Sequence, residues 1–148
     1  MLTLEKVITL ASVSIFAEIP EESLVEVASA LVEIEVEAGE VIFKRGDIGT
    51  SMYIIAAGKV RIHDDNKELG ILGEREVFGE LAALDPEPRS ASATAIEDAY
   101  LLRIDQELFL EVMTQHGNVA RGVLRVLCQR IRQADALIHA MMTVGAQK

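Results

Sequence analysis

The sequence has little of what marks a secreted or membrane protein. Cysteine occurs once in 148 residues, at Cys128, so the chain cannot form an internal disulfide, which favours a reducing compartment such as the cytoplasm. The N-terminus lacks the basic start and the long apolar stretch of a secretory signal. The apolar run Met52–Ala57 is about a third of the ~20 residues that a membrane-spanning helix needs. We therefore predict a cytoplasmic chain without a membrane span.

Residue sets for catalysis or metal binding are also missing. The three histidines, His63, His116 and His139, lack the paired spacing found in metal enzymes with a β-roll, such as cupins. No nucleophile elbow, Walker loop or paired-cysteine motif occurs. Cys128 falls in an apolar helical stripe, where we expect it to pack. We predict no catalytic residue, no metal ligand and no cofactor, and hence a protein that is not an enzyme.

Positive charge is scarce in the first two thirds of the chain. Residues 1–98 hold 20 acidic and 8 basic side chains, a balance of −12, and residues 99–148 hold 4 and 6, a balance of +2, which gives the formal net charge of −10. Such a field repels nucleic acid. An anionic ligand must then be attracted locally, by a specific basic side chain and aimed backbone N–H groups.

The apolar half of the residues is enough to bury one core and predicts a single domain over residues 1–148. Helical periodicity in residues 1–31 predicts two helices, the first with an apolar stripe of Leu4, Val7, Ile8 and Ala11 and the second beginning at Pro20. From 32 to 105 the period is that of strands, expected at 32–36, 41–43, 52–57, 60–62, 69–72, 92–95 and 99–104. Many short strands with regular turns predict an antiparallel β-roll, a jelly-roll-like double-stranded β-helix.

Helical spacing returns over residues 106–142. A short helix ends at Gly117-Asn118, and the final helix extends beyond about 20 residues. Its arginines, at 121, 125, 130 and 132, are interpreted as a solvated face rather than a nucleic-acid contact. The fold class is therefore mainly β, with N-terminal helices and a long C-terminal helix.

The candidate functional segment is residues 78–93, which lie between expected strands. Glycine there precedes a short helix-forming run, and two of the three prolines follow it. A helix beginning near Gly79 would present unpaired backbone N–H groups, and the absent side chain would let a ligand approach. Arg89 can hold a phosphate with two parallel hydrogen bonds, whereas Glu80 would accept hydrogen bonds from a sugar hydroxyl. The combination predicts an anion pocket.

This segment resembles the phosphate-binding cassette of the cyclic-nucleotide-binding domain family, of protein kinase A regulatory-subunit and catabolite-activator type. The resemblance rests on Phe78-Gly79-Glu80-Leu81 and Pro88-Arg89-Ser90-Ala91, with supporting matches at 38–42, 46–49 and 52–60, and covers residues 16–131. It implies that Glu80 holds the ribose 2′-hydroxyl and that Arg89 and the Ser90 N–H hold the cyclic phosphate. The implied ligand-binding set also includes Gly79, Leu81 and Ala91.

The base-binding part of the implied site is less defined. In the family the last helix commonly caps the base, and by register Ala134, Asp135 and Leu137 are nearest, of which only Asp135 is polar. Candidates for the apolar wall are Ile62, Leu69 and Leu72, although core packing would also account for them.

Two positions depart from the family pattern. Ser90 replaces the alanine of kinase-type domains, so cyclic AMP and cyclic GMP both stay open, with cyclic AMP favoured by family frequency. Arg75 falls where many relatives have glycine, in the turn before the cassette.

The function implied is a regulatory sensor that binds cyclic AMP or cyclic GMP and signals through movement of its C-terminal helix. Its expected partners are the nucleotide and either a second copy, bound through that helix, or a larger effector protein. The sequence lacks the winged helix-turn-helix of the family's transcription factors, so we expect no direct contact with DNA. The alternative is a ligand-free scaffold or dimerisation module, excised from a larger transporter, channel or repeat protein.

Overall fold

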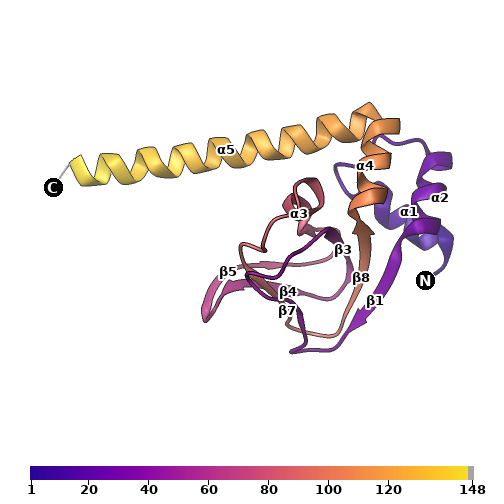
Figure 1. The fold of residues 1–148 in the computed structure, drawn as a ribbon, viewed down its shortest axis with the longest axis horizontal. Coiled ribbons are helices and arrows are strands. Elements are labelled where there is room, and N and C mark those ends of the chain that lie inside the picture. Colours follow the sequence, from indigo (N-terminus) through magenta and orange to yellow (C-terminus); the bar gives the residue numbers. More distant parts are fainter. Residues whose placement is uncertain (147–148) are drawn as a thin grey trace.

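The computed structural model describes residues 1–146, apart from the side chains of Leu81 and Ala146. Helices α1 (Thr3–Ser12) and α2 (Glu21–Ala30) precede the strands, and α4 (Gln106–Gln115) and α5 (Gly117–Ala146) follow them. Figure 1 shows α1, α2, α4 and the start of α5 gathered at one end of the molecule, from which α5 runs out above the strands. No helix in residues 1–146 combines the length and the apolar character needed to cross a bilayer.

The strands form two antiparallel sheets of four strands each. The first has the order β1-β8-β3-β6, with bounds Val32–Val36, Ala99–Asp105, Ser51–Ala57 and Val77–Phe78. The second has the order β2-β7-β4-β5, with bounds Val41–Phe43, Ser92–Ala95, Val60–Asp64 and Lys67–Leu72. This antiparallel roll with flanking helices and a long C-terminal helix confirms the predicted architecture, and the short strand β6 is an addition to it.

Strand β3 separates two apolar cores. Its side chains alternate between the two faces of the sheet, so Met52 and Ile54 pack against the helices, whereas Tyr53 and Ile55 pack against the second sheet. Because both faces are covered, this strand is apolar at successive positions, as its sequence indicates. The inter-sheet core then supports the strands that surround the functional segment.

Two predictions about helix faces are wrong. In α1 the buried residues are Val7 and Leu10, while Leu4, Ile8 and Ala11 of the predicted stripe are exposed. Apolar residues cover much of the circumference of α1, so spacing alone does not decide which side faces the core. Cys128 is exposed rather than packed, because it lies on the outer side of α5, whereas its neighbour Leu127 lines the cavity on the inner side.

Candidate functional site

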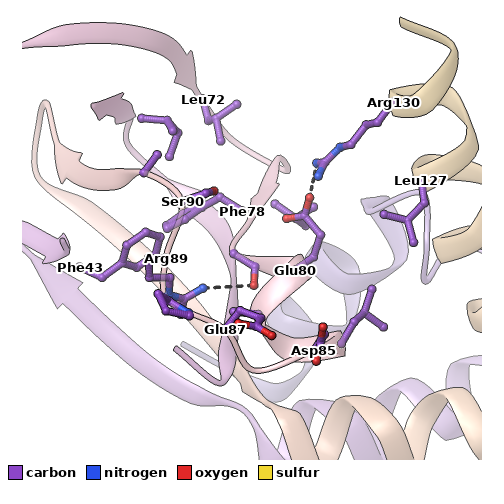
Figure 2. Close-up of a pocket in the computed structure, with 17 residues that line it drawn as sticks. Phe43, Leu72, Phe78, Glu80, Asp85, Glu87, Arg89, Ser90, Leu127 and Arg130 are labelled. Atoms are coloured by element: carbon purple, nitrogen blue, oxygen red, sulfur yellow. Dashed lines mark hydrogen bonds and ion pairs between the residues drawn. The ribbon is translucent and has the colours of Figure 1, made fainter. Parts of the chain in front are cut away.

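A cavity of about 670 Å³ lies between the roll, the short helix α3 (Glu80–Leu84) and α5 (Figure 2). This volume is within the range of small-molecule sites, about 300–1,000 Å³. Its walls are mostly apolar and come from both sheets, from α3 with the loop after it, and from α5. No group of three His, Cys, Asp or Glu side chains within the described part of the chain is arranged to hold a metal ion.

Arg89 places a guanidinium in the wall of the cavity, with only 7% of the residue exposed. Nη2 donates a hydrogen bond to the carbonyl of Ser51 (2.9 Å), and Nη1 donates to the carbonyl of Gly79 (3.2 Å). The ring centroid of Phe43 lies 4.1 Å from Cζ, a cation–π contact. Nε is buried and has no hydrogen-bond partner among the described residues. The guanidinium is thus held in place but not fully satisfied.

Within residues 1–146 the charge of Arg89 also lacks a counter-ion. No carboxylate in the described residues forms an ion pair with it. Burial lowers the pKa of the guanidinium, and the charges of Tyr53, Asp47 and Glu80 oppose this effect. A buried cation without a paired anion is costly, so an anion in the cavity would complete the site.

Glu80 points the other way, toward α5 (Figure 2). Its Oε1 forms an ion pair with Nη2 of Arg130. The side chain of Glu80 is 11% exposed and that of Arg130 is 46% exposed, so the pair links a buried carboxylate to the surface of α5. Within residues 1–146 it is the only ion pair that joins α5 to the roll.

Only glycine fits at position 79, between the side chain of Arg89 and the backbone of Ser51. Its φ is +78°, and an added Cβ would lie 2.7 Å from Nη1 of Arg89 and 3.1 Å from the carbonyl oxygen of Ser51. Both the conformation and the space therefore need glycine. α3 begins directly after it, as predicted, but is only five residues long. Arg89 is consequently the main positive group on this side of the cavity.

The structure brings together seven of the ten residues predicted to bind the ligand: Ile62, Leu72, Gly79, Glu80, Arg89, Ser90 and Ala91 all line the cavity. Leu69 and Asp135 do not line it, and both are exposed. Leu69 lies on the outer face of β5, where alternation places Leu72 inward, and Asp135 lies on the part of α5 beyond the body. The side chain of Leu81 is outside the described ones.

Four lining residues lie outside the predicted segment 78–93 and were not predicted as part of the site: Phe43, Val77, Leu127 and Arg130. Phe43 is distant in sequence from the cassette, and no local pattern connects them. Arg130 was assigned to the solvated face of α5. It lies three residues after Leu127 and seven after the buried Val123, so helical spacing does place it on the inward side. That spacing is the signal that could have found it.

Comparisons with known proteins identify the family of the chain. Residues 33–116 match the family described as "Cyclic nucleotide-binding domain". The Cyclic AMP receptor protein of Thermus thermophilus is 39% identical over 102 residues, which cover 66% of this chain and 47% of that protein. A CRP-like cAMP-activated global transcriptional regulator of Mycobacterium tuberculosis is 30% identical over 131 residues, covering 85% and 58%. The chain therefore spans about half the length of these relatives.

A solved structure supports the same assignment. The crystal structure of Thermus thermophilus catabolite activator protein superposes with a TM-score of 0.80 and 32% identity, covering 86% of this chain and 62% of that chain. Taken with the cassette and the family match over residues 33–116, this shows that the chain belongs to the cyclic nucleotide-binding domain family and is a regulatory domain of that kind.

Proposed function

We propose that the domain binds cyclic AMP in the 670 Å³ cavity. The observation that carries this proposal is the buried guanidinium of Arg89, which has two carbonyl partners, an aromatic ring, a free Nε and no carboxylate. A cyclic phosphate supplies the missing anion, and charge-assisted hydrogen bonds to it are stronger than those to carbonyls. The relative named as a Cyclic AMP receptor protein favours the adenine nucleotide.

The other lining residues fit the remaining parts of the nucleotide. The ribose hydroxyl donates a hydrogen bond to Oε2 of Glu80, because the ion pair with Arg130 uses Oε1. The backbone at Ser90 and Ala91 continues the phosphate site, and Ile62 and Leu72 provide apolar contacts in the same cavity. A large apolar wall with a few polar groups is the usual composition of such a site.

Cyclic GMP is the second candidate, and Ser90 is the residue that favours it. Its side chain lines the cavity and is exposed there, so its hydroxyl is available to a ligand. A hydroxyl next to the phosphate can bond either the phosphate or the amino group of a syn guanine, whereas an alanine at this position could do neither.

The signal is proposed to leave the site through α5. Glu80 contacts both the expected position of the ribose and Arg130 of α5, and Leu127 of the same helix lines the cavity. A nucleotide that changes the hydrogen bonding of Glu80 therefore changes the contacts that hold α5 on the roll. The position of α5 is the two-state element that ligand binding would bias.

The exposed part of α5 is proposed to pair with the same helix of a second copy. Leu124, Ile131 and Ile138 recur every seven residues and are 54–61% exposed, and Leu127, Ala134 and Met141 follow each of them by three residues. This heptad pattern is that of a two-stranded coiled coil. The proposed role is that of a sensor without catalytic activity, in the cytoplasm, acting through its partner copy or an effector protein rather than through nucleic acid.

Calorimetric titration with cyclic AMP, cyclic GMP and 5′-AMP tests this function. We expect cyclic AMP to bind, 5′-AMP to bind far more weakly, and Arg89→Ala to lose about 2 kcal/mol, or roughly thirtyfold in affinity. The control is Arg121→Ala, which removes an exposed arginine of α5. If millimolar cyclic nucleotide leaves the melting temperature of the wild type unchanged, the domain is the ligand-free scaffold instead.

A further inference from the structure

The loop between β2 and β3, residues 44–50, packs directly against Arg89 although it lies outside the cassette. The N–H of Arg89 donates to the carbonyl of Asp47 (2.7 Å), and the N–H of Gly46 donates to the carbonyl of Arg89 (2.8 Å). An isolated β-bridge joins Ile48 to Pro88. The loop backbone is therefore fixed to the backbone of the residue whose side chain enters the cavity wall.

Gly49 of this loop is in contact with the Arg89 side chain. A Cβ at Gly49 would lie 2.0 Å from Nε, 2.3 Å from Cζ and 2.6 Å from Nη2, which are distances that no real Cβ adopts. Unlike Gly79, Gly49 does not have a positive φ. Its glycine is therefore explained by the space that the guanidinium occupies and not by a left-handed backbone.

We propose that Gly49 is a positioning residue: its lack of a side chain lets the guanidinium of Arg89 adopt the orientation needed for ligand binding. Gly49 packs against Nε and Cζ, and the ring centroid of Phe43 lies 4.1 Å from Cζ. The carbonyls of Ser51 and Gly79 accept hydrogen bonds from the two terminal nitrogens. This inference rests on the proposed function for its effect on affinity, whereas the packing of Gly49 against Arg89 can be tested without ligand, by unfolding.

A side chain at position 49 must displace the guanidinium rather than the loop. Moving the loop would break both backbone hydrogen bonds to Arg89, whereas the side chain of Arg89 can rotate. Rotation withdraws Nη1 and Nη2 from their two carbonyl partners and leaves those partners unsatisfied. Gly49→Ala should therefore lower both stability and nucleotide affinity, through Arg89 in each case.

A double-mutant cycle tests this proposal, with wild type, Gly49→Ala, Arg89→Ala and the double variant. Thermal unfolding without ligand and titration with cyclic AMP are measured for each. We expect Gly49→Ala to lower the melting temperature by several degrees and the affinity by about tenfold or more. In the Arg89→Ala background, Gly49→Ala should lower neither the melting temperature nor the affinity any further, because the clashing side chain is gone. If Gly49→Ala does not fold, the folding of the double variant is the expected rescue.

The control is Gly73→Ala, at a glycine of the same roll with no atom within 4 Å of its added Cβ and no positive φ. Gly73→Ala should change the melting temperature by the same amount in the wild type and in Arg89→Ala. An equal loss of stability for Gly49→Ala with and without Arg89, or a double variant that also fails to fold, would overturn the proposal. Absence of cyclic AMP binding to the wild type would contradict the proposed function. The unfolding data of the four proteins would still decide whether Gly49 positions Arg89.

Discussion

Arg75 holds a backbone conformation that residues with a side chain seldom adopt, with φ +71° in the turn before β6. Its N–H donates to the carbonyl of Ile55 (2.8 Å), and the N–H of Glu76 donates to the carbonyl of Gly73 (3.2 Å). The turn is thus fixed by its hydrogen bonds, and Arg75 holds a conformation that glycine adopts at no steric cost. Because its side chain is exposed, the strain belongs to the turn and not to the ligand site.

Arg75→Gly should stabilise the ligand-free protein by up to about 1 kcal/mol. A left-handed conformation costs a residue with a Cβ about 1–2 kcal/mol, and the larger conformational entropy of unfolded glycine offsets part of that gain. Chemical denaturation measures the difference. Arg75→Ala removes the same side chain but keeps the Cβ, so it should show no gain, and equal stability of the two variants would contradict the explanation.

The cassette was predictable at this scale because its residues are contiguous. Gly79, Glu80 and Arg89 stand in one segment whose order is itself informative, and the structure places all three at the cavity. Phe43 and Gly49 were not predictable as part of the site, because their link to Arg89 depends on how the β2–β3 loop folds onto residues 88 and 89. A glycine that is needed for space rather than for turn geometry has no local sequence pattern.

The ion pair between Arg130 and Glu80 joins α5 to the roll, so its removal should change the affinity for the ligand. Arg130 holds Oε1 and leaves the other carboxylate oxygen for the ribose. Arg130→Gln should therefore weaken cyclic AMP binding by about threefold to tenfold, a modest loss because the arginine is partly exposed. Calorimetric titration measures it.

Arg132→Gln is the matched control, because Arg132 is exposed and lies roughly on the opposite side of α5 from Arg130. Its affinity should equal that of the wild type. Tighter binding in Arg130→Gln would mean that the ion pair competes with the nucleotide for Glu80, and unchanged binding would mean that Arg130 does not orient the carboxylate.

The contact between α1 and β1 should contribute stability that depends on pH. Nζ of Lys6 lies 3.1 Å from Oε1 of Glu33. The hydrogen bond from Lys6, followed by that from Tyr100, lowers the pKa of Glu33 below its ordinary value of 4.5. A lowered pKa in the folded state adds stability that is present above pH 4.5 and is lost as the pH falls through the folded value.

Lys6→Gln removes the main cause of that shift. The wild type should be the more stable of the two at pH 6–7, and the difference should shrink as the pH is lowered below about 4. Unfolding free energies at a series of pH values give the comparison, with the exposed Lys67→Gln as the control. A difference between wild type and Lys6→Gln that stays constant over this range would show that Lys6 contributes through packing alone.

Element boundaries followed from the sequence more closely than element faces did. The strand at Val32–Val36 was predictable from strict alternation, and its partner β8 from an apolar run. The inward side of α1 was not, since Leu4 and Ile8 are as apolar as the buried Val7 and Leu10. Which face is buried depends on the partner that packs on the helix, and spacing within one element does not contain that partner.

Over the whole molecule, charge and exposed apolar surface are both unevenly distributed. α5 carries four arginines and one aspartate, while residues 1–98 have a balance of −12. Its C-terminal half extends past the roll, and no other helix or strand of residues 1–146 covers it (Figure 1). Large apolar side chains in this half and directly before it are more than half exposed, including Ile131, Ile138 and Met142. An exposed stripe of this size marks an interaction surface, and its proposed partner is the same helix of a second copy.

Ile131→Glu should therefore convert the proposed dimer into a monomer. A charge at the centre of a heptad seam has no water and no partner, so pairing of the two α5 helices should fall by more than about a hundredfold. Sedimentation equilibrium gives the mass, and a short bifunctional maleimide on the single Cys128 should link wild-type copies but not the variant. Gln129→Glu adds the same charge two residues away, outside the seam, and should leave the dimer intact. A wild type that stays monomeric at high concentration would contradict the proposed pairing and leave contact with an effector protein as the role of the stripe.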